Sequence, residues 1–233
     1  QWQATLSHRF VQVLHAKGKL TRLYTQNIDG LDYQCSSIPP EKIVPVHGSI
    51  GRVACEACGA ACDFDAFCEQ VRSNIKDIYR QDAAAPAESS PIECGRCGRP
   101  TVKPTTVLFG SSLPAEFFDK AAEDLPNVDL LIVAGTSLVV APANSVVYQV
   151  DAECPRLVVN REPVGHELGV RYGEQSSRDV FGEGECDAVF LELARLLGWL
   201  PELQAFEAAL PEHSRTLLQR ALAEERKQRG VVE

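Results

Sequence analysis

The hydrophobic residues of the chain follow two patterns that alternate along its length. Short strand-like runs, most of them apolar, occur at residues 20–24, 43–46, 129–134 and 156–159. Segments with helical spacing lie before, between and after these runs, at residues 5–17, 114–123, 143–150 and 187–197. Because strands alternate with helices and the later runs are apolar after their first residue, the pattern predicts an α/β fold with a doubly wound parallel sheet.

This alternation is interrupted between residues 51 and 103. Two Cys-x-x-Cys pairs, a helical pattern at residues 65–80 and a loop rich in Ala, Pro and Ser replace it. Since α/β patterning then resumes, we interpret residues 51–103 as a module inserted into a sheet domain of residues 1–50 and 104–200. We predict that residues 201–233 form a C-terminal helical tail, because they have the pattern of one or two charged surface helices.

The inserted module carries four cysteines at the spacing of a metal site: Cys55, Cys58, Cys94 and Cys97. Each Cys-x-x-Cys pair can hold one metal ion from a tight turn, and two pairs complete a tetrahedral sulfur shell. A glycine follows each pair, which suits such turns. Because a closed shell of four thiolates leaves no position for water, we predict one structural Zn²⁺ in preference to a redox pair or unrelated core cysteines.

Composition and charge exclude several classes of protein. The 233 residues are 45% hydrophobic, enough for a core, and the net charge of −9 is opposite to that of a nucleic-acid-binding surface. No apolar run approaches the roughly 18 residues of a membrane span, and no secretory signal is present. The cysteine count is odd, nine, which favours a reducing compartment. We therefore expect an intracellular protein, cytoplasmic or nuclear, without membrane or direct nucleic-acid partners.

Three polar clusters directly follow predicted strands. Their members are Gln26, Asn27, Ile28 and Asp29; Gly135, Thr136 and Ser137; and Asn160, Arg161 and Glu162. Taken alone, the first cluster is typical of a turn and the second of a helix start. Because ligands of open α/β sheets bind outside the carboxyl ends of the strands, we expect the clusters to face one crevice. Their amide, hydroxyl and carboxylate groups suit the ribose hydroxyls of a nucleotide.

His47 also follows a predicted strand and precedes Gly48 and Ser49. An imidazole titrates near neutrality, so His47 is a candidate general base. On this evidence alone, a structural role for the side chain is the commoner interpretation.

The order of the motifs is similar to that of the sirtuin family. The motifs are TQNIDGLD at residues 25–32, HGS at 47–49, the paired Cys-x-x-Cys module, VLFGSSLP at 107–114, GTSL at 135–138, NRE at 160–162, and GECD at 184–187 with LLGW at 196–199. Together they cover residues 1 to about 200. The two closing motifs resemble the branch of the family with robust deacetylase activity.

The resemblance implies a Rossmann-like domain that binds NAD as a consumed co-substrate for removing acetyl or other acyl groups from protein lysines. It implies that His47 deprotonates a ribose hydroxyl of NAD and that the products are nicotinamide and O-acyl-ADP-ribose. The cluster from Gln26 to Asp29 would hold the nicotinamide ribose, and the other two clusters the adenosine half. Cys186 would contact adenine through its backbone. Histone tails or other acyl-lysine peptides would be the partners.

The resemblance also assigns the acyl-lysine tunnel to Val107, Phe109 and Gly110. Apolar residues there fit a neutral acylated side chain, and an extended backbone could pair with a substrate peptide. Without the family pattern, ordinary core packing explains Val107 and Phe109 equally well. The family has a glutamate where this chain has Ser111, which removes a carboxylate at the edge of the cleft and leaves the peptide preference open.

The sequence begins at a point that follows the family's first strand and its Gly-Ala-Gly-x-Ser turn. Glycines in such a turn let backbone amides reach a pyrophosphate at a helix N-terminus. We therefore expect the 233-residue chain by itself to bind NAD weakly and to turn over slowly. Two alternatives stay open at this stage: transfer of ADP-ribose to protein, and a catalytically inactive scaffold that binds partners through the zinc module.

Overall fold

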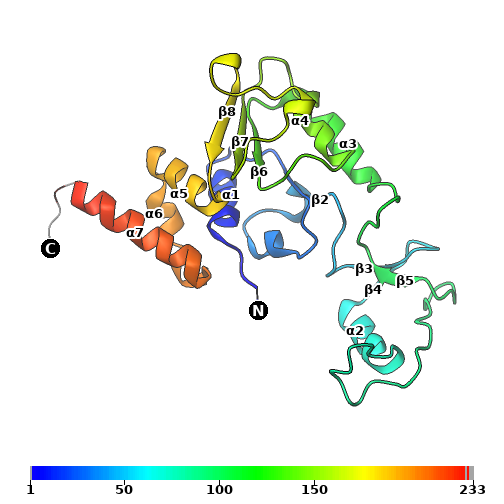
Figure 1. Cartoon of the computed structure of the whole chain (residues 1–233). Coiled ribbons are helices and arrows are strands. Elements are labelled where there is room, and N and C mark those ends of the chain that lie inside the picture. The colour runs from blue at the N-terminus through cyan, green and yellow to red at the C-terminus, as the bar shows by residue number, and fades with distance from the viewer. Residues whose placement is uncertain (1, 229, 231–233) are drawn as a thin grey trace. The chain divides into compact units, whose positions relative to one another are not determined.

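The computed structural model describes residues 2–228 and 230 (Figure 1). The chain divides into two compact units, which we name the sheet unit and the cysteine unit. The sheet unit comprises residues 1–25, 31–46 and 115–233, and the cysteine unit comprises residues 26–30 and 47–114.

The strands of the sheet unit are parallel. β6 (Leu131–Ala134), β7 (Arg156–Asn160) and β8 (Asp179–Glu183) form a three-stranded sheet in that order. β1 (Leu23–Thr25) pairs in parallel with β2 (Ile43–Pro45). These pairings confirm the predicted α/β class with parallel strands. The pattern had predicted no strand at β8.

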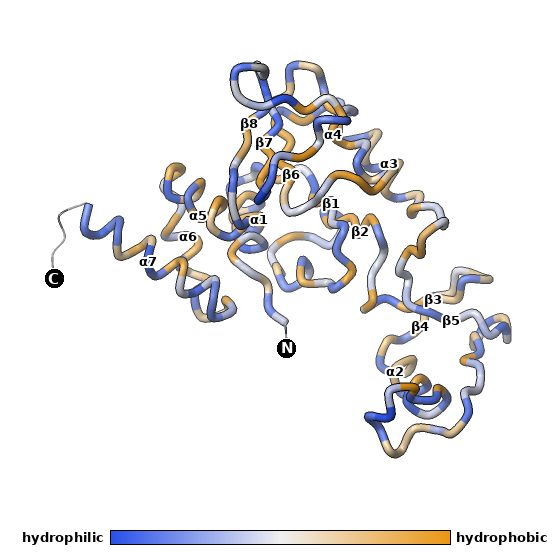
Figure 2. Tube along the Cα trace, viewed as in Figure 1, coloured by the Kyte–Doolittle hydropathy of each residue, from blue (hydrophilic) through white to orange (hydrophobic). Residues whose placement is uncertain are grey.

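The central strand β7 separates two hydrophobic clusters. Side chains of consecutive strand residues point to opposite faces of a sheet. Val158 accordingly packs into a cluster with Val133 and Val147, whereas its neighbour Val159 packs into a larger cluster with Phe10. Figure 2 shows β6 and β7 as predominantly hydrophobic. The sheet is therefore covered on both faces, as a doubly wound arrangement requires.

The larger cluster is built by four helices. They are α1 (Leu6–Ala16), α5 (Cys186–Leu196), α6 (Leu200–Gln204) and α7 (Glu212–Gln228). Within it, Phe10 stacks on Phe190 with ring centroids 4.8 Å apart. Leu203 of α6 and Leu218 of α7 are fully buried. The helices after residue 200 thus contribute to the principal core of the sheet unit.

Two further helices of the sheet unit are α3 (Ala115–Asp124) and α4 (Val146–Gln149). Ala121 of α3 and Val146 of α4 contribute to a smaller cluster with Leu125 and Cys154. α4 is short because residues 143–145 form a single 3₁₀ turn before it. Among the residues that the structure describes, no helix has both the length and the apolarity needed to cross a bilayer.

The cysteine unit is built on an antiparallel sheet in the order β4 (Ala61–Cys62), β3 (Val53–Cys55), β5 (Val102–Pro104). Its one α-helix within the described chain, α2 (Phe64–Asn74), starts where the Asp63 carboxylate accepts a hydrogen bond from the Ala66 amide at 2.8 Å. α2 ends before residue 80, where the helical pattern had predicted its end, and no residue of α2 is buried.

Candidate functional site

The four cysteines of the cysteine unit lie close together. The sulfur atoms of Cys55, Cys58, Cys94 and Cys97 are all within 4.8 Å of one another. The Cys55 and Cys97 sulfurs are 3.6 Å apart, and those of Cys58 and Cys94 are 3.7 Å apart. A tetrahedral zinc ion with Zn–S bonds of about 2.3 Å requires sulfur–sulfur distances of about 3.8 Å. The cluster therefore has the size of a zinc site, as its spacing predicted.

The two Cys-x-x-Cys turns have the same backbone structure. In the first, the Gly59 amide donates to the Cys55 carbonyl at 2.8 Å, and the Cys55 amide donates to the Ala60 carbonyl at 2.9 Å. In the second, the Gly98 amide donates to the Cys94 carbonyl, and the Cys94 amide to the Arg99 carbonyl, at the same two distances. Gly59 and Gly98 both have a φ of +69°, which other residues adopt only with strain.

Hydrogen-bond donors near two of the sulfurs favour thiolates, the form that binds zinc, whereas burial and the neighbouring sulfurs raise the pKa of Cys58. The Thr101 hydroxyl lies 3.2 Å from the Cys55 sulfur and, with nearby backbone amides, lowers the pKa of that thiol to about 6. The Arg96 amide donates to the Cys94 sulfur at 3.4 Å, and backbone amides lower the pKa of Cys94. Four thiolates leave no coordination position open, so an ion here would be structural.

A second group of predicted residues lies elsewhere in the cysteine unit, around His47. The Nδ1 atom of His47 is 3.0 Å from the Gln26 carbonyl oxygen. A carbonyl can only accept, so Nδ1 donates this hydrogen bond, and in the neutral imidazole Nε2 carries the lone pair. The Ile50 amide donates to the Ile28 carbonyl at 2.9 Å, which joins the turn at residues 26–29 to the segment after His47. The geometry therefore leaves Nε2 as the basic atom of His47.

The backbone next to His47 packs against the segment at residues 105–107. Gly48 has a φ of +72°, and a Cβ atom there would lie 2.0 Å from the Thr105 carbonyl oxygen. The Val107 amide donates to the His47 carbonyl at 2.9 Å. Beyond it, Phe109 is fully exposed and Gly110 occupies a turn. The structure thus places Val107 beside His47, whereas Phe109 has no packing partner that would indicate a core role.

The sheet unit contains a polar cavity of about 310 Å³ at the carboxyl ends of its strands. It is lined by Gly135, Asn160, Arg161, Gly184, Glu185 and Cys186. Gly135 follows β6, Asn160 ends β7, and the turn at residues 184–186 follows β8. Four of the predicted nucleotide-binding residues therefore meet in one cavity. The other two residues of its wall, Gly184 and Glu185, belong to the GECD motif, and this motif is the sequence feature from which they could have been predicted.

The walls of this cavity are closely packed. Gly135 has a φ of +63°, and a Cβ atom there would lie 3.3 Å from the Cys186 sulfur. Burial raises the pKa of the Cys186 thiol, so this side chain is a neutral wall. Arg161 and Glu185 form an ion pair of 2.6 Å. Both side chains are mostly exposed, which places the pair at the mouth of the cavity.

The other predicted residues of the sheet unit lie next to the cavity but do not line it. The Thr136 hydroxyl accepts from the Leu138 amide at 3.2 Å, and the Thr136 carbonyl accepts from the Asn160 side chain at 3.3 Å. Ser137 and Glu162 are exposed. Asp187, which the sequence analysis did not select as a site residue, directly follows Cys186 of the cavity wall.

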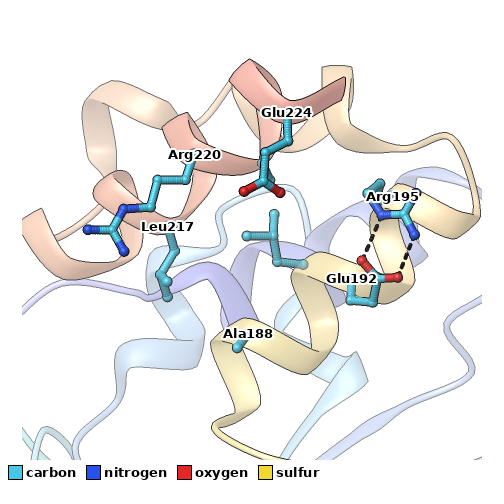
Figure 3. Close-up of a pocket in the computed structure, with 8 residues that line it drawn as sticks. Ala188, Glu192, Arg195, Leu217, Arg220 and Glu224 are labelled. Carbon is cyan, nitrogen blue, oxygen red and sulfur yellow. Dashed lines mark hydrogen bonds and ion pairs between the residues drawn. The ribbon is translucent and has the colours of Figure 1, made fainter. Parts of the chain in front are cut away.

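A second, smaller groove of about 180 Å³ lies between α5 and α7 (Figure 3). Its floor is apolar, with Ala188 and Leu217, and its rim carries Arg220 and Glu224. Charges of both signs, including the Glu192–Arg195 ion pair at 2.6 Å, surround it. Because these charges compensate one another, the groove favours no particular ligand charge.

The fold and these sites define an α/β protein with a polar ligand cavity at the ends of parallel strands and a four-cysteine metal module. Comparison with known proteins narrows this class. A family model described as "Sir2 family" matches residues 1–142, more than half of the chain. The chain therefore belongs to the Sir2 family.

Several members of this family are similar to the chain. NAD-dependent protein deacetylase sirtuin-2 of Danio rerio is 35% identical over 227 residues, 92% of this chain and 55% of that protein. NAD-dependent deacetylase sir2A of Dictyostelium discoideum is 36% identical over 84% of this chain and 36% of its own length. Human NAD-dependent protein deacetylase sirtuin-1 is 36% identical over 85% of this chain and 23% of its own length. The chain thus spans about half or less of these relatives.

Proposed function

We propose that this protein removes acetyl or other acyl groups from protein lysines and consumes NAD in doing so. The observation that carries the proposal is the cavity at the strand ends, because it brings Gly135, Asn160, Arg161 and Cys186 together in a Sir2-family chain. Relatives over 84% or more of the chain are named NAD-dependent deacetylases.

The cavity would hold the adenosine half of NAD. Asn160 offers an amide side chain for ribose hydroxyls, and Gly135 lets the backbone approach the ligand. Backbone groups of the turn at residues 184–186 would face the adenine edge. Glu162 and Ser137 are exposed nearby and would add oxygen acceptors for the ribose.

His47 would act as the general base. The hydrogen bond from Nδ1 to the Gln26 carbonyl leaves the Nε2 lone pair available for a proton of the nicotinamide ribose. In the reaction that the family resemblance implies, the acyl oxygen bonds to the ribose carbon as nicotinamide departs with the bonding electrons. His47 would then accept a ribose hydroxyl proton as that oxygen bonds to the acyl carbon, and addition of water with cleavage of the acyl C–N bond would release the lysine amine and O-acyl-ADP-ribose. Asn27 and Asp29 would position the nicotinamide end.

The remaining assignments concern the metal, the substrate and the compartment. The four-cysteine cluster would hold one Zn²⁺ that fixes the fold of the cysteine unit and takes no part in bond breaking. Val107, Phe109 and Gly110 would contact an acylated lysine, and the exposed Phe109 offers apolar surface for it. All nine cysteines are free, which supports an intracellular location. Acetylated proteins, including histones, would be the partners.

The test is nicotinamide release by the full natural chain, measured with NAD alone, an acetyl-lysine peptide alone, and both together. We expect release only with both, accompanied by equal amounts of deacetylated peptide. A His47→Ala variant should lose about 100-fold or more of the rate, the range of general-base catalysis. His213→Ala, an exposed histidine on α7, is the matched control.

Three outcomes would contradict the proposal. Transfer of labelled ADP-ribose to protein without deacetylation would indicate ADP-ribosyl transfer. An NAD-dependent rate that is unchanged in His47→Ala would remove the assigned base. Failure of the full natural chain to bind NAD would indicate a scaffold.

A further inference from the structure

Asp187 connects three helices through one carboxylate. It lies in the first turn of α5 and accepts hydrogen bonds from the N-terminus of α1: from the Thr5 hydroxyl at 2.8 Å, and from the Ser7 amide and hydroxyl at 2.9 and 2.5 Å. The Leu6 amide donates to its second oxygen at 3.3 Å. The Ser214 hydroxyl of α7 donates to the same oxygen at 2.5 Å.

These contacts favour the charged carboxylate. Burial by itself raises the pKa of Asp187, but the hydroxyl groups of Ser214, Ser7 and Thr5, together with the Ser7 amide, outweigh it and leave the pKa below its ordinary value. The amides at the start of α1 also lack partners within their own helix, so a carboxylate there satisfies them and interacts favourably with the helix dipole.

Asp187 directly follows the wall of the cavity. Cys186, its neighbour, lies against Gly135, and the Gly184 amide donates to the Asn160 carbonyl at 2.9 Å. At the start of α5, the Val189 amide donates to the Glu185 carbonyl at 3.0 Å. The turn at residues 184–186 is thus held by β7 on one side and by the start of α5 on the other.

We propose that Asp187 is a positioning residue for the nucleotide cavity: by tying the start of α5 to α1 and α7, it fixes the turn at residues 184–186 in the conformation that receives the ligand. The inference rests on the proposed function for the identity of the ligand, NAD. The geometry of the inference is independent of the proposed function, because the hydrogen bonds of Asp187 are formed within the chain itself.

The arrangement also gives α7 a role. α7 contributes Ser214, which is almost completely buried, to the node that supports the cavity wall. Although α7 contributes no residue to the wall itself, its docking sets the position of Asp187 and therefore of the turn before it. Affinity for NAD should depend on a helix that does not touch NAD.

The experiment uses Asp187→Asn, which keeps the shape but replaces an acceptor oxygen with a donor that faces other donors. Because the new amide donor faces the donors of α1 and α7 and leaves the turn less firmly held, we expect the Kd for NAD to rise about tenfold or more. The kcat at saturating NAD should change little. Ser214→Ala removes one hydrogen bond and should raise the Kd by about two- to threefold.

The matched control is Asp124→Asn at the end of α3. Asp124 is also buried and accepts hydrogen bonds from Arg22 and Tyr24, but it lies outside the cavity wall. This variant should lower the melting temperature while the Kd for NAD stays within about twofold, because no ligand-binding turn depends on it.

A second readout needs no ligand. Hydrogen exchange of the Gly184 and Val189 amides in the free protein should accelerate in Asp187→Asn and in Ser214→Ala, and not in Asp124→Asn. Unchanged exchange and unchanged Kd in both test variants would overturn the positioning role. If Asp187→Asn does not fold, Ser214→Ala decides alone. If the unaltered protein fails to bind NAD, the proposed function fails, and the exchange rates still decide whether Asp187 positions the turn.

Discussion

The two units of the chain hold their folds by different means. The sheet unit contains large hydrophobic clusters in which Phe10, Leu203 and Leu218 are almost completely buried. The cysteine unit has few buried apolar side chains, among them Val53 and Leu113, and its helix α2 buries none. Hydrophobic burial can therefore account for the first unit, whereas we expect the second to depend on metal binding by its four-cysteine cluster. The contrast predicts that one chain combines two sources of stability.

Metal removal should give the largest effect. Structural zinc contributes an apparent ~10–16 kcal/mol in small metal-dependent domains, so the apo form should lose protection throughout residues 51–104 while the sheet unit keeps its own. Hydrogen exchange with and without a chelator measures both units at once. Cys94→Ser should act like the chelator, and Cys62→Ser is the control within the same unit, because Cys62 lies outside the cluster. Equal loss in both units would mean that they fold as one.

The converse test is a substitution that creates a cavity in the core of the sheet unit and leaves the cysteine unit unchanged. Leu203→Ala removes a fully buried side chain and should lower the free energy of unfolding of this unit by about 2–5 kcal/mol, measured by urea titration. Zinc content, determined by mass spectrometry of the native protein, should not change. Leu196→Ala, at a side chain that is 68% exposed, is the control and should change stability by less than about 0.5 kcal/mol.

Lowering the pH should unfold the two units at different pH values. Burial raises the pKa of Asp179, but the Arg156 side chain and the Arg171 amide outweigh it and keep the pKa below the ordinary value of 3.8. That contribution is complete above 3.8 and is lost as the pH falls through the lower pKa of the folded protein. Protons compete with metal for thiolates, whose ordinary pKa is about 8.5, at much higher pH. Exchange protection should therefore disappear first in the cysteine unit; simultaneous loss would refute this order.

The smallest effect should come from the surface of the sheet unit. Glu192 and Arg195 form an ion pair of 2.6 Å on α5, with half of the glutamate side chain exposed. Glu192→Gln should change the free energy of unfolding by less than about 0.5 kcal/mol, and less still in high salt. A change above about 1 kcal/mol, measured by urea titration, would show that the groove between α5 and α7 contributes more than its exposure indicates.

The metal site could be predicted from the sequence because its geometry is local. Each Cys-x-x-Cys turn is complete within six residues, from Cys55 to Ala60 and from Cys94 to Arg99, so spacing and glycines were sufficient. The strands β6 and β7 were predictable for a similar reason, since their apolar runs are continuous. β8 was not predicted, because Gly182 and the acidic residues at both ends of the strand interrupt its run of apolar residues.

Two features were not predicted, one of them local and one dependent on distant contacts. The helical pattern continued to residue 80, but the chain leaves the helix after Asn74, and the Asp77 carboxylate accepts hydrogen bonds from the amides of residues 79, 81 and 82. Asp187 was overlooked because its partners lie far away in sequence, in α1 and at Ser214. The positions of the individual NAD contacts stay predictions.

The two matching cysteine turns have a consequence for how the family can vary. With a metal bound, they hold the two ends of residues 63–93, the part of the cysteine unit between β4 and the second turn, close together. The entropy of closing such a loop rises by only about 0.6 kcal/mol for each doubling of its length. We therefore expect residues 63–93 to tolerate insertions or deletions at little entropic cost, while the cysteine turns at their ends stay the same.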